Sequence, residues 1–194
     1  MTHPLQIFEA WFVEAQEREL NDANACALAT VDLDQAGLPR PDVRIVLLKG
    51  VGAEGFTFFT NYRSAKGLQL SACPVAALDF HWKSLRRQVR VQGVVARVSE
   101  SESDEYFATR PRESQLSAWA SRQSEPLDDR STFEARLAEA AELFPGEIPR
   151  PAHWGGYRLR PDWIEFWEDR VGRQHHRERF SRVEGGWDMQ LLYP

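Results

Sequence analysis

Cations stand at the ends of two apolar segments in the first part of the chain. Arg44 and Lys49 flank the run Ile45–Leu48, and Ser64 and Lys66 follow the next apolar run. A positive charge at the end of a buried strand needs water, a carboxylate or a bound anion as its partner. Hydroxyl groups and lysines together suit a phosphate, because charge-assisted hydrogen bonds are the strong ones. The alternative is a core hairpin whose terminal cations are solvated.

A second group of anion-binding side chains is expected where two helices meet. Pro111 is a favourable first residue for a helix, so the free N–H groups of that helix would lie beside Arg110, Arg112 and the Ser114 hydroxyl. Tyr106 lies one turn earlier, from where its phenol could point to the same place. The alternative is a helix–helix corner with solvated arginines.

Other kinds of chemistry find less support. Adjacent His175 and His176 would point to opposite faces of a strand, and no cysteine or acidic cluster accompanies them, so we expect no metal site. Neither a Ser-His-Asp nor a Cys-His arrangement for nucleophilic catalysis is evident. Cys26 and Cys73 lie among small apolar residues and are interpreted as reduced, packed thiols.

Length and composition favour one domain, residues 1–194. No apolar run approaches the roughly 18 residues of a membrane span, and no signal segment is visible at the N-terminus, so we expect a cytoplasmic protein. The net charge of -5 argues against a general nucleic-acid binder. Seven tryptophans indicate large apolar contacts, and we assign Trp119 and Trp154 to the core or an interface.

The first group of cations is expected on a β-hairpin. Arg44–Lys49 and Phe56–Asn61 are apolar and rich in β-branched and aromatic residues, and the glycine-rich segment between them is typical of a long turn. Both faces of Arg44–Lys49 are apolar, so we expect this strand to be buried on each side. Ser64 is a favourable N-cap for a short helix through Leu70, whose N–H groups would lie close to Lys66.

The remaining pattern predicts many short strands and a few helices, which together suggest an antiparallel barrel. Helices are expected over residues 5–20, 99–109, 111–121 and 131–144, strands over 25–32, 75–82 and 87–98, and closing strands over Gly155–Leu159, Trp163–Trp167, Arg177–Val183 and Trp187–Leu192. Asp34–Gly37 is expected to form a turn after the first strand.

These motifs, in this order, resemble the pyridoxine/pyridoxamine 5′-phosphate oxidase family, and the likeness extends from about residue 5 to Pro194. It rests on Arg44–Lys49, Phe58–Asn61, Ser64-x-Lys66, Arg87–Val89, Tyr106-Phe107, Arg110–Gln115, Ala118-Trp119, Gln123-Ser124, Trp154–Gly156, Glu165–Trp167 and Arg173–Arg177. The resemblance implies a mainly β (α+β) fold, an antiparallel split β-barrel with flanking helices, built as a homodimer.

The resemblance also implies an activity. Family members are FMN-dependent oxidases that convert pyridoxine 5′-phosphate or pyridoxamine 5′-phosphate to pyridoxal 5′-phosphate, with O2 as acceptor and H2O2 as product, in vitamin B6 biosynthesis and salvage. The flavin carries the redox step, and the protein binds, orients and tunes it.

Residue roles follow from the same resemblance. The implied FMN-binding positions are Arg44, Ile45, Val46, Leu47, Leu48, Lys49, Phe59, Thr60, Lys66, Gln88, Gln123, Ser124, Trp167 and Arg177. The implied substrate-binding positions are Lys49, Tyr106, Arg110, Ser114, Arg173 and His175, of which Arg173 and His175 are also the catalytic pair. In the family Gln123, Ser124, Trp167 and Arg177 come from the opposite subunit, so FMN would lie at the subunit interface.

The chain departs from the family pattern at a few positions. Ala65 replaces a usual arginine, for which Arg63 could compensate, and His176 replaces a usual aspartate. The segment before the first helix is short, so we expect a more open substrate site.

Two alternatives stay open. One is a related flavin oxidase of the phenazine-biosynthesis type, which would not need the phosphate-binding group at Lys49, Tyr106, Arg110 and Ser114. The other is a non-catalytic module that stores or senses flavin or haem, which would not need Arg173 and His175.

Overall fold

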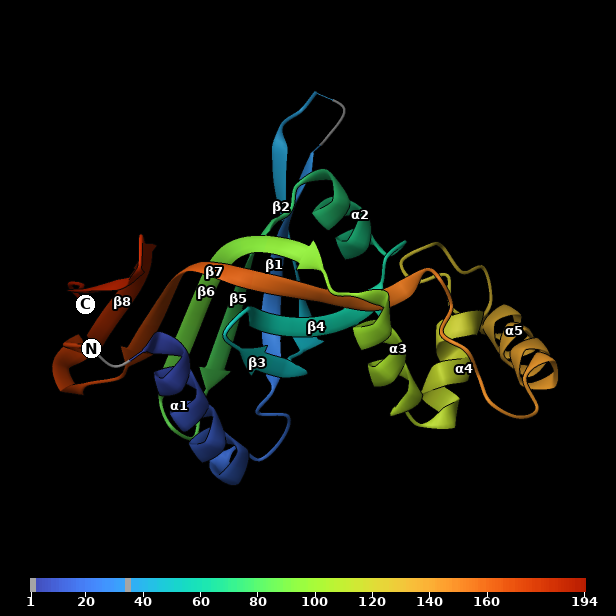
Figure 1. The fold of residues 1–194 in the computed structure, drawn as a ribbon, viewed down its shortest axis with the longest axis horizontal. Coiled ribbons are helices and arrows are strands. Elements are labelled where there is room, and N and C mark those ends of the chain that lie inside the picture. The colour runs from blue at the N-terminus through green and yellow to red at the C-terminus, as the bar shows by residue number, and fades with distance from the viewer. Residues whose placement is uncertain (1–2, 34–35) are drawn as a thin grey trace.

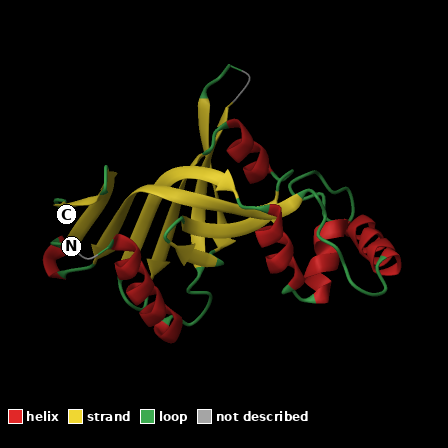
Figure 2. Ribbon diagram, viewed as in Figure 1, coloured by secondary structure: helices red, strands yellow, loops and turns green. Residues whose placement is uncertain are grey.

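The computed structural model describes residues 3–33 and 36–194 and shows an α+β fold built on one antiparallel sheet (Figures 1 and 2). The helices are α1 (Pro4–Arg18), α2 (Ala65–Ala72), α3 (Glu100–Ala108), α4 (Arg112–Ala120), α5 (Arg130–Leu143) and the short 3-10 helix η1 (Val171–Arg173). The strands are β1 (Ala25–Leu33), β2 (Pro39–Leu47), β3 (Gly50–Gly52), β4 (Gly55–Asn61), β5 (Val75–Trp82), β6 (Arg87–Arg97), β7 (Trp154–Glu168), β8 (His176–Val183) and β9 (Gly186–Leu191).

The sheet has the strand order β2-β1-β5-β6-β7-β4-β3, and β8 pairs with β7 and β9. The long strands β6 and β7 curve across the sheet (Figure 1). Helix α1 lies at one end, near the N-terminus, whereas α3, α4 and α5 gather at the other end. The expectation of an antiparallel split barrel with flanking helices is therefore confirmed.

The main core fills the space between α1 and the sheet. Phe8 of α1 is fully buried, and its ring lies 4.8 Å from that of Phe56 and 5.1 Å from that of Phe80, both edge to face. On β6, Val89 and Val91 are fully buried and alternate with the more exposed Arg90 and Gln92. The burial of these aromatic rings fixes the barrel on which the site is built.

A second cluster joins α3, α4 and α5 to the beginning of β7 through Phe107, Leu116, Ala140 and Trp154. Helix α3 approaches β7 closely, because the Gly156 N–H donates to Ser103 Oγ of α3 at 3.2 Å and a Cβ at Gly155 would lie 3.0 Å from the same oxygen. This close packing sets α3 and α4 beside the end of β4, which is where the cavity described below opens.

The predicted hairpin between Arg44–Lys49 and Phe56–Asn61 is wrong. Strand β2 pairs with β1, and the glycine-rich segment assigned to a long turn forms β3, which pairs with β4 through a tight turn. Gly55 closes that turn with φ of +122°, a conformation that side chains other than glycine rarely adopt. Local apolar runs do not reveal which strand pairs with which, and β1 offers β2 a nine-residue partner.

The expectation that β2 is buried on both faces is also wrong within one chain. Val43 is 64% exposed, Ile45 66% and Leu47 39%, whereas Leu48, just after the strand, is 4% exposed. Strand β2 is an edge strand with one apolar face outside the barrel. A further correction concerns β7, predicted as two strands but continuous, because Pro161 lies at a register shift opposite Gly93, where a proline is tolerated.

The other predicted helices and strands are confirmed, with ends that agree to within two residues. Ser64 is the N-cap of α2, as expected, and Ser99 caps α3 by accepting a hydrogen bond from the Glu102 N–H. Part of the predicted turn Asp34–Gly37 lies outside the described residues. Within the described ranges, no helix is long and apolar enough to cross a membrane.

Candidate functional site

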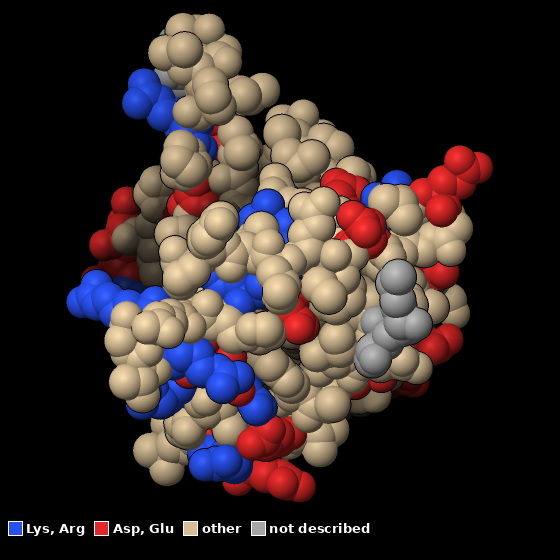
Figure 3. Space-filling model, turned by 90° about the vertical axis from the view of Figure 1, so that its left-hand side faces the viewer, with Lys and Arg blue, Asp and Glu red and all other residues tan. Residues whose placement is uncertain are grey.

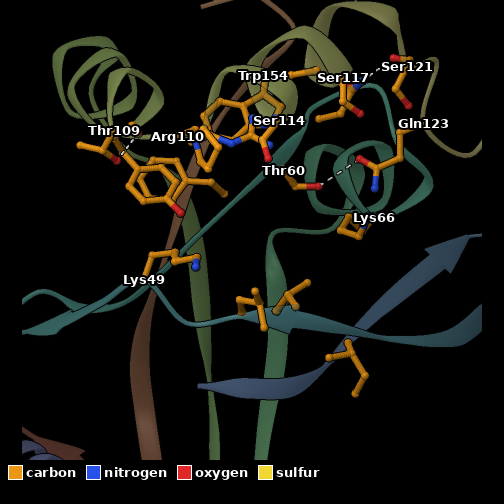
Figure 4. Close-up of a pocket in the computed structure, with 18 residues that line it drawn as sticks. Lys49, Thr60, Lys66, Thr109, Arg110, Ser114, Ser117, Ser121, Gln123 and Trp154 are labelled. Atoms are coloured by element: carbon orange, nitrogen blue, oxygen red, sulfur yellow. Dashed lines mark hydrogen bonds between the residues drawn. The ribbon is translucent and has the colours of Figure 1, made fainter. Parts of the chain in front are cut away.

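A cavity of about 530 Å³ lies between β2, the end of β4, α2 and the α3–α4 corner (Figure 4). It is lined by Ile45, Val46, Leu47, Lys49, Phe59, Thr60, Asn61, Lys66, Tyr106, Thr109, Arg110, Pro111, Ser114, Ser117, Ala118, Ser121, Gln123 and Trp154. Three of these residues are cationic, and none of those that the structure describes along this cavity is an aspartate or glutamate. The cavity therefore favours an anionic ligand.

Lys66 provides a buried cation at one end of this cavity. It lies in the first turn of α2 and is only 7% exposed, with Nζ 3.4 Å from the Ser64 Oγ. Burial lowers the pKa of Lys66, the Arg44 charge lowers it further, and Asp42 partly opposes both. A phosphate here would find Lys66 together with the N–H groups that begin α2.

Arg110 provides a second cation at the α3–α4 corner. Burial lowers its pKa, and its Nη1 is buried without a hydrogen-bond partner among the described residues. Its guanidinium carbon lies 4.5 Å from the centre of the Trp154 ring. Tyr106 stacks on Phe59 with ring centres 3.9 Å apart, so its phenol lines the same cavity. Figure 4 shows Arg110 with Trp154 on one side of the cavity, Lys66 on another and Lys49 below.

Hydroxyl groups connect these two cationic ends. Ser114, Ser117 and Ser121 line the cavity at helical spacing along α4, and the Thr60 hydroxyl lies 3.5 Å from Gln123 Oε1. Ser117 and Ser121 were not predicted, although their i+3 and i+7 spacing from Ser114 could have revealed them. Asn61, Thr109, Pro111, Ala118 and Trp154 also line the cavity and were not predicted to bind a ligand.

Arg44 and Arg112 have other partners. Arg44 forms an ion pair with Asp42 and donates hydrogen bonds to Gln69 Oε1 at 2.9 Å and to Thr30 Oγ1 at 2.5 Å. Arg112 donates to the Gly146 carbonyl at 2.6 Å, so it does not join Arg110 as expected. Leu48 belongs to the main core, and the expected compensation by Arg63 lacks support because its side chain is exposed.

The implied catalytic pair lies at the β7–β8 corner and does not line the cavity of its own chain. The His175 ring lies 4.6 Å from the Trp167 ring, and its Nδ1 lies 3.0 Å from the Asp169 carboxylate. Arg173 has φ of +60°, in the left-handed region that non-glycine residues seldom occupy. On the adjoining strand, Gln88 pairs across from Trp167.

Arg177 is held by a buried carboxylate. Glu165, 1% exposed, accepts hydrogen bonds from Arg177 Nε at 2.9 Å, from Arg177 Nη2 at 2.7 Å and from Arg179 Nη2 at 2.8 Å. Burial alone would raise the pKa of Glu165, but the hydrogen bonds from Arg179 and Arg177 outweigh it and lower the pKa. Figure 3 looks onto the end of the molecule that carries β8, where basic side chains gather beside acidic ones.

Within one chain the structure thus separates the implied residues into two sets. Ile45, Val46, Leu47, Lys49, Phe59, Thr60, Lys66, Tyr106, Arg110, Ser114 and Gln123 line the cavity, whereas Gln88, Trp167, Arg173, His175 and Arg177 lie on β6 and around the β7–β8 corner. Gln123, which the resemblance assigns to the opposite subunit, lines the cavity of its own chain, and its role in FMN binding stays a prediction. Ser124, which follows it, has φ of +75°.

The two cysteines lie apart from the cavity lining. Cys26 is buried, and burial together with the Asp79 charge raises its pKa to about 12. Cys73 is a free thiol at the C-terminal end of α2. Among the described residues, no group of three or more His, Cys, Asp or Glu side chains could hold a metal ion.

Comparison with known proteins covers nearly the whole chain. Residues 12–144 match the family described as pyridoxamine 5′-phosphate oxidase, and residues 154–194 match a pyridoxine 5′-phosphate oxidase C-terminal dimerisation region. A pyridoxine/pyridoxamine 5′-phosphate oxidase from Hyphomonas neptunium is 57% identical over 99% of this chain and 87% of its own length. One from Sphingopyxis alaskensis is 54% identical over 98% of this chain and 87% of its own length.

A solved structure matches the whole chain at lower identity. PhzG from Burkholderia lata, in complex with tetrahydrophenazine-1-carboxylic acid, is 29% identical and covers 100% of this chain and 94% of its own, with a TM-score of 0.92. The arrangement of strands and helices is thus shared with a protein whose ligand is an aromatic acid.

Proposed function

The chain belongs to the pyridoxine/pyridoxamine 5′-phosphate oxidase family, and we propose that it is an FMN-dependent oxidase that forms pyridoxal 5′-phosphate from pyridoxine or pyridoxamine 5′-phosphate. Oxygen is the acceptor and H2O2 a product, and the amine substrate also consumes water and releases ammonia. When bound, the flavin would take a hydride from the C4′ carbon of the substrate and return the electrons to oxygen.

The observation that carries this proposal is a pair of cations, Lys66 buried and Arg110 half-buried, in one cavity whose described lining contains no carboxylate. Lys66 and Arg110 lie in different parts of the lining, and each lacks a carboxylate neighbour among the described cavity residues. A charge that is withdrawn from water without an ion-pair partner is costly, so each cation favours its own anionic group. FMN and the substrate each carry one phosphate, which matches this arrangement.

The residues of this chain divide the work of binding. Lys66 and the first N–H groups of α2 hold the FMN phosphate, and Ile45, Val46 and Leu47 offer apolar surface to the flavin ring. Lys49, Tyr106, Arg110 and Ser114 hold the substrate phosphate, which suits a mixed set of charged and hydroxyl donors. Arg44 acts through the partly buried network with Asp42 and Gln69 rather than by lining the cavity.

The remaining FMN-binding and catalytic residues come from a partner subunit. Trp167, Arg173, His175 and Arg177 belong to the segment that matches the dimerisation region, and they do not line the cavity of their own chain. We therefore propose a homodimer of single-domain subunits, with FMN at the interface. In this arrangement Arg173 stabilises charge that develops on the substrate as the hydride leaves.

The likeness to PhzG favours a second candidate, the oxidation of a reduced aromatic acid. Cations such as Arg110 bind carboxylates as well as phosphates. The group of Lys49, Tyr106, Arg110 and Ser114 exceeds what one carboxylate needs, which supports the phosphorylated substrate.

Oxidation of pyridoxine 5′-phosphate in air, followed by absorbance of the aldehyde product and by H2O2 release, tests the proposal. We expect turnover of the phosphorylated substrate and a protein that purifies with FMN. Arg173→Ala should reduce turnover strongly and leave FMN bound, because Arg173 contacts the substrate. Tight FMN binding without formation of the aldehyde would instead favour the aromatic-acid or storage alternatives.

A further inference from the structure

Trp154 lies where the substrate phosphate is proposed to bind, although the sequence predicted a place for it in the core or at an interface. It is the first residue of β7, is 7% exposed and lines the cavity. Its ring is nearly parallel to those of Phe59 and Tyr106, with interplanar angles of 13° and 9°. The three rings form one aromatic wall, and Arg110 lies at 4.5 Å from its Trp154 member (Figure 4).

Arg110 needs a support that does not occupy its hydrogen-bond donors. A guanidinium carries five N–H donors in one plane and binds phosphate through two of them at once. A carboxylate partner would occupy that edge, and none lies among the described residues of the cavity. An aromatic face attracts the cation from above its plane, so the N–H edge stays available. The buried, unpaired Nη1 is consistent with such an available edge.

Trp154 is itself fixed from three sides. Its backbone N–H donates to the Pro151 carbonyl at 2.9 Å, and its backbone carbonyl accepts from Arg150 Nη1 at 2.7 Å. Arg150 also donates from Nε to the Asp104 carboxylate of α3 at 2.6 Å. Across the sheet Trp154 pairs with Asn61 at the end of β4. These contacts hold the Trp154 backbone relative to α3 and β4, and the indole stacks with Tyr106 of α3 and Phe59 of β4.

We propose that Trp154 is a positioning residue for Arg110: its face orients the guanidinium so that the N–H edge meets the substrate phosphate. This inference rests on the proposed function for the identity of the substrate. Its physical content, a preorganised phosphate site supported by an indole, can be measured without turnover. Because a desolvated cation–π contact is at stake, loss of the indole should weaken phosphate binding by about tenfold.

The test compares Trp154→Leu with Trp154→Phe and with the control Trp119→Leu. Trp119 is a neighbouring tryptophan whose Nε1 donates to the Pro149 carbonyl and which does not line the cavity. On FMN-loaded protein we expect KM for pyridoxine 5′-phosphate to rise about tenfold in Trp154→Leu, with kcat changed less than KM. Trp154→Phe should recover part of the loss, and Trp119→Leu should leave KM unchanged.

Two further measurements separate this inference from a structural effect and from the proposed function. Affinity for inorganic phosphate, measured by calorimetry on the same proteins, should fall about tenfold in Trp154→Leu but not in Trp119→Leu. Equal phosphate affinity in wild type and Trp154→Leu overturns the positioning role, even where the wild type oxidises the substrate. If the wild type oxidises no B6 phosphate but Trp154→Leu still binds inorganic phosphate about tenfold more weakly than the wild type, the proposed function is overturned and the role of Trp154 is supported. If Trp154→Leu does not fold, Trp154→Phe carries the comparison, and a phosphate affinity equal to that of the wild type then counts against the role.

Discussion

A buried lysine without a carboxylate destabilises the folded chain until a ligand supplies the opposite charge. Lys66 is close to this situation, because its side chain is buried at the start of α2, its Nζ lies 3.4 Å from the Ser64 hydroxyl, and the Asp42 charge offsets burial only in part. The same applies to Arg110, whose Nη1 has no partner among the described atoms. At both positions the free protein gives up stability that ligand binding recovers.

Substitution of Lys66 by methionine separates the effect of this charge on the stability of the free protein from its effect on FMN binding. Without FMN, Lys66→Met should be more stable than the wild type by about 1 kcal/mol, because a buried charge is replaced by an apolar chain of similar length. Its affinity for FMN should fall at least tenfold, since a charge-assisted contact to phosphate is worth more than about 1.4 kcal/mol. Denaturant unfolding of the FMN-free protein and FMN titration measure the two quantities.

The pH dependence of stability in the FMN-free wild type and Lys66→Met proteins provides the control. The pKa of Lys66 is lowered in the folded state from its usual 10.5, so its protonated form is disfavoured by folding. Stability of the FMN-free wild type should therefore rise as the pH increases toward 10.5, and Lys66→Met should lack that increase. A Lys66→Met protein that is less stable and binds FMN normally would contradict the proposed role.

The sequence predicted which residues could bind an anion better than it predicted which side chains those residues contact. The residues that line the cavity include Lys49, Lys66 and Arg110, all predicted as anion-binding from their neighbours in the chain. Arg44 was predicted with them, but its ion pair with Asp42 depends on two strand residues facing the same side. Trp154 was not predicted to be near a ligand, because nothing in its local sequence indicates that Arg110 lies against it.

At the scale of elements, the β7–β8 pair is held together by one buried carboxylate. Glu165 of β7 accepts hydrogen bonds from Arg177 and Arg179 of β8, and Arg90 of β6 lies 3.6 Å away. Removing a buried carboxylate from such a group is costly, because the half-buried Arg177 and Arg179 lose the charge that compensates them. Glu165 therefore positions Arg177, which the proposed function places at the flavin of the partner subunit.

Glu165→Gln should reduce the free energy of unfolding at neutral pH by about 3 kcal/mol. The pKa of Glu165 is lowered in the folded state from 4.5, so its contribution is complete above pH 4.5 and is lost as the pH falls further. The stability difference between wild type and Glu165→Gln should therefore shrink below pH 4.5. Unfolding curves at several pH values measure this difference.

Glu178→Gln on the same strand is a matched control, because Glu178 pairs with His176 near the surface and should contribute little. Equal stability of Glu165→Gln and Glu178→Gln would contradict the role given to Glu165.

Helices and isolated strands could be predicted from local pattern, whereas strand pairing could not. The predicted cap at Ser64 is a local signal that the structure confirms, and the cap at Ser99 and the alternation around Val89 likewise depend on neighbouring residues. The pairing of β2 with β1 rather than β4 depends on contacts between distant segments. The continuity of β7 depends on Gly93 facing Pro161, two residues that lie far apart in the sequence.

At the scale of the whole molecule, one chain provides an incomplete site. The β2 face around Val43 and Ile45 is apolar and exposed, although the sequence predicted its burial. Exposed apolar patches of this kind are typical of interaction surfaces. The β7–β8 corner, which carries Arg173, lies at the opposite end of the molecule from α4 (Figure 1). A homodimer resolves both observations when the corner of one subunit reaches the cavity of its partner.

Mixing two inactive variants tests this arrangement. Arg110→Gln disables the cavity, and Arg173→Ala disables the corner, so neither homodimer should oxidise pyridoxine 5′-phosphate. In a mixed dimer one site receives both defects, and the other combines an intact cavity with an intact corner. Random pairing makes half of the dimers mixed, each with one of two sites intact, so co-expression in equal amounts should restore about a quarter of wild-type activity. If each site were built within one chain, every site would carry one defect and mixing would restore no activity.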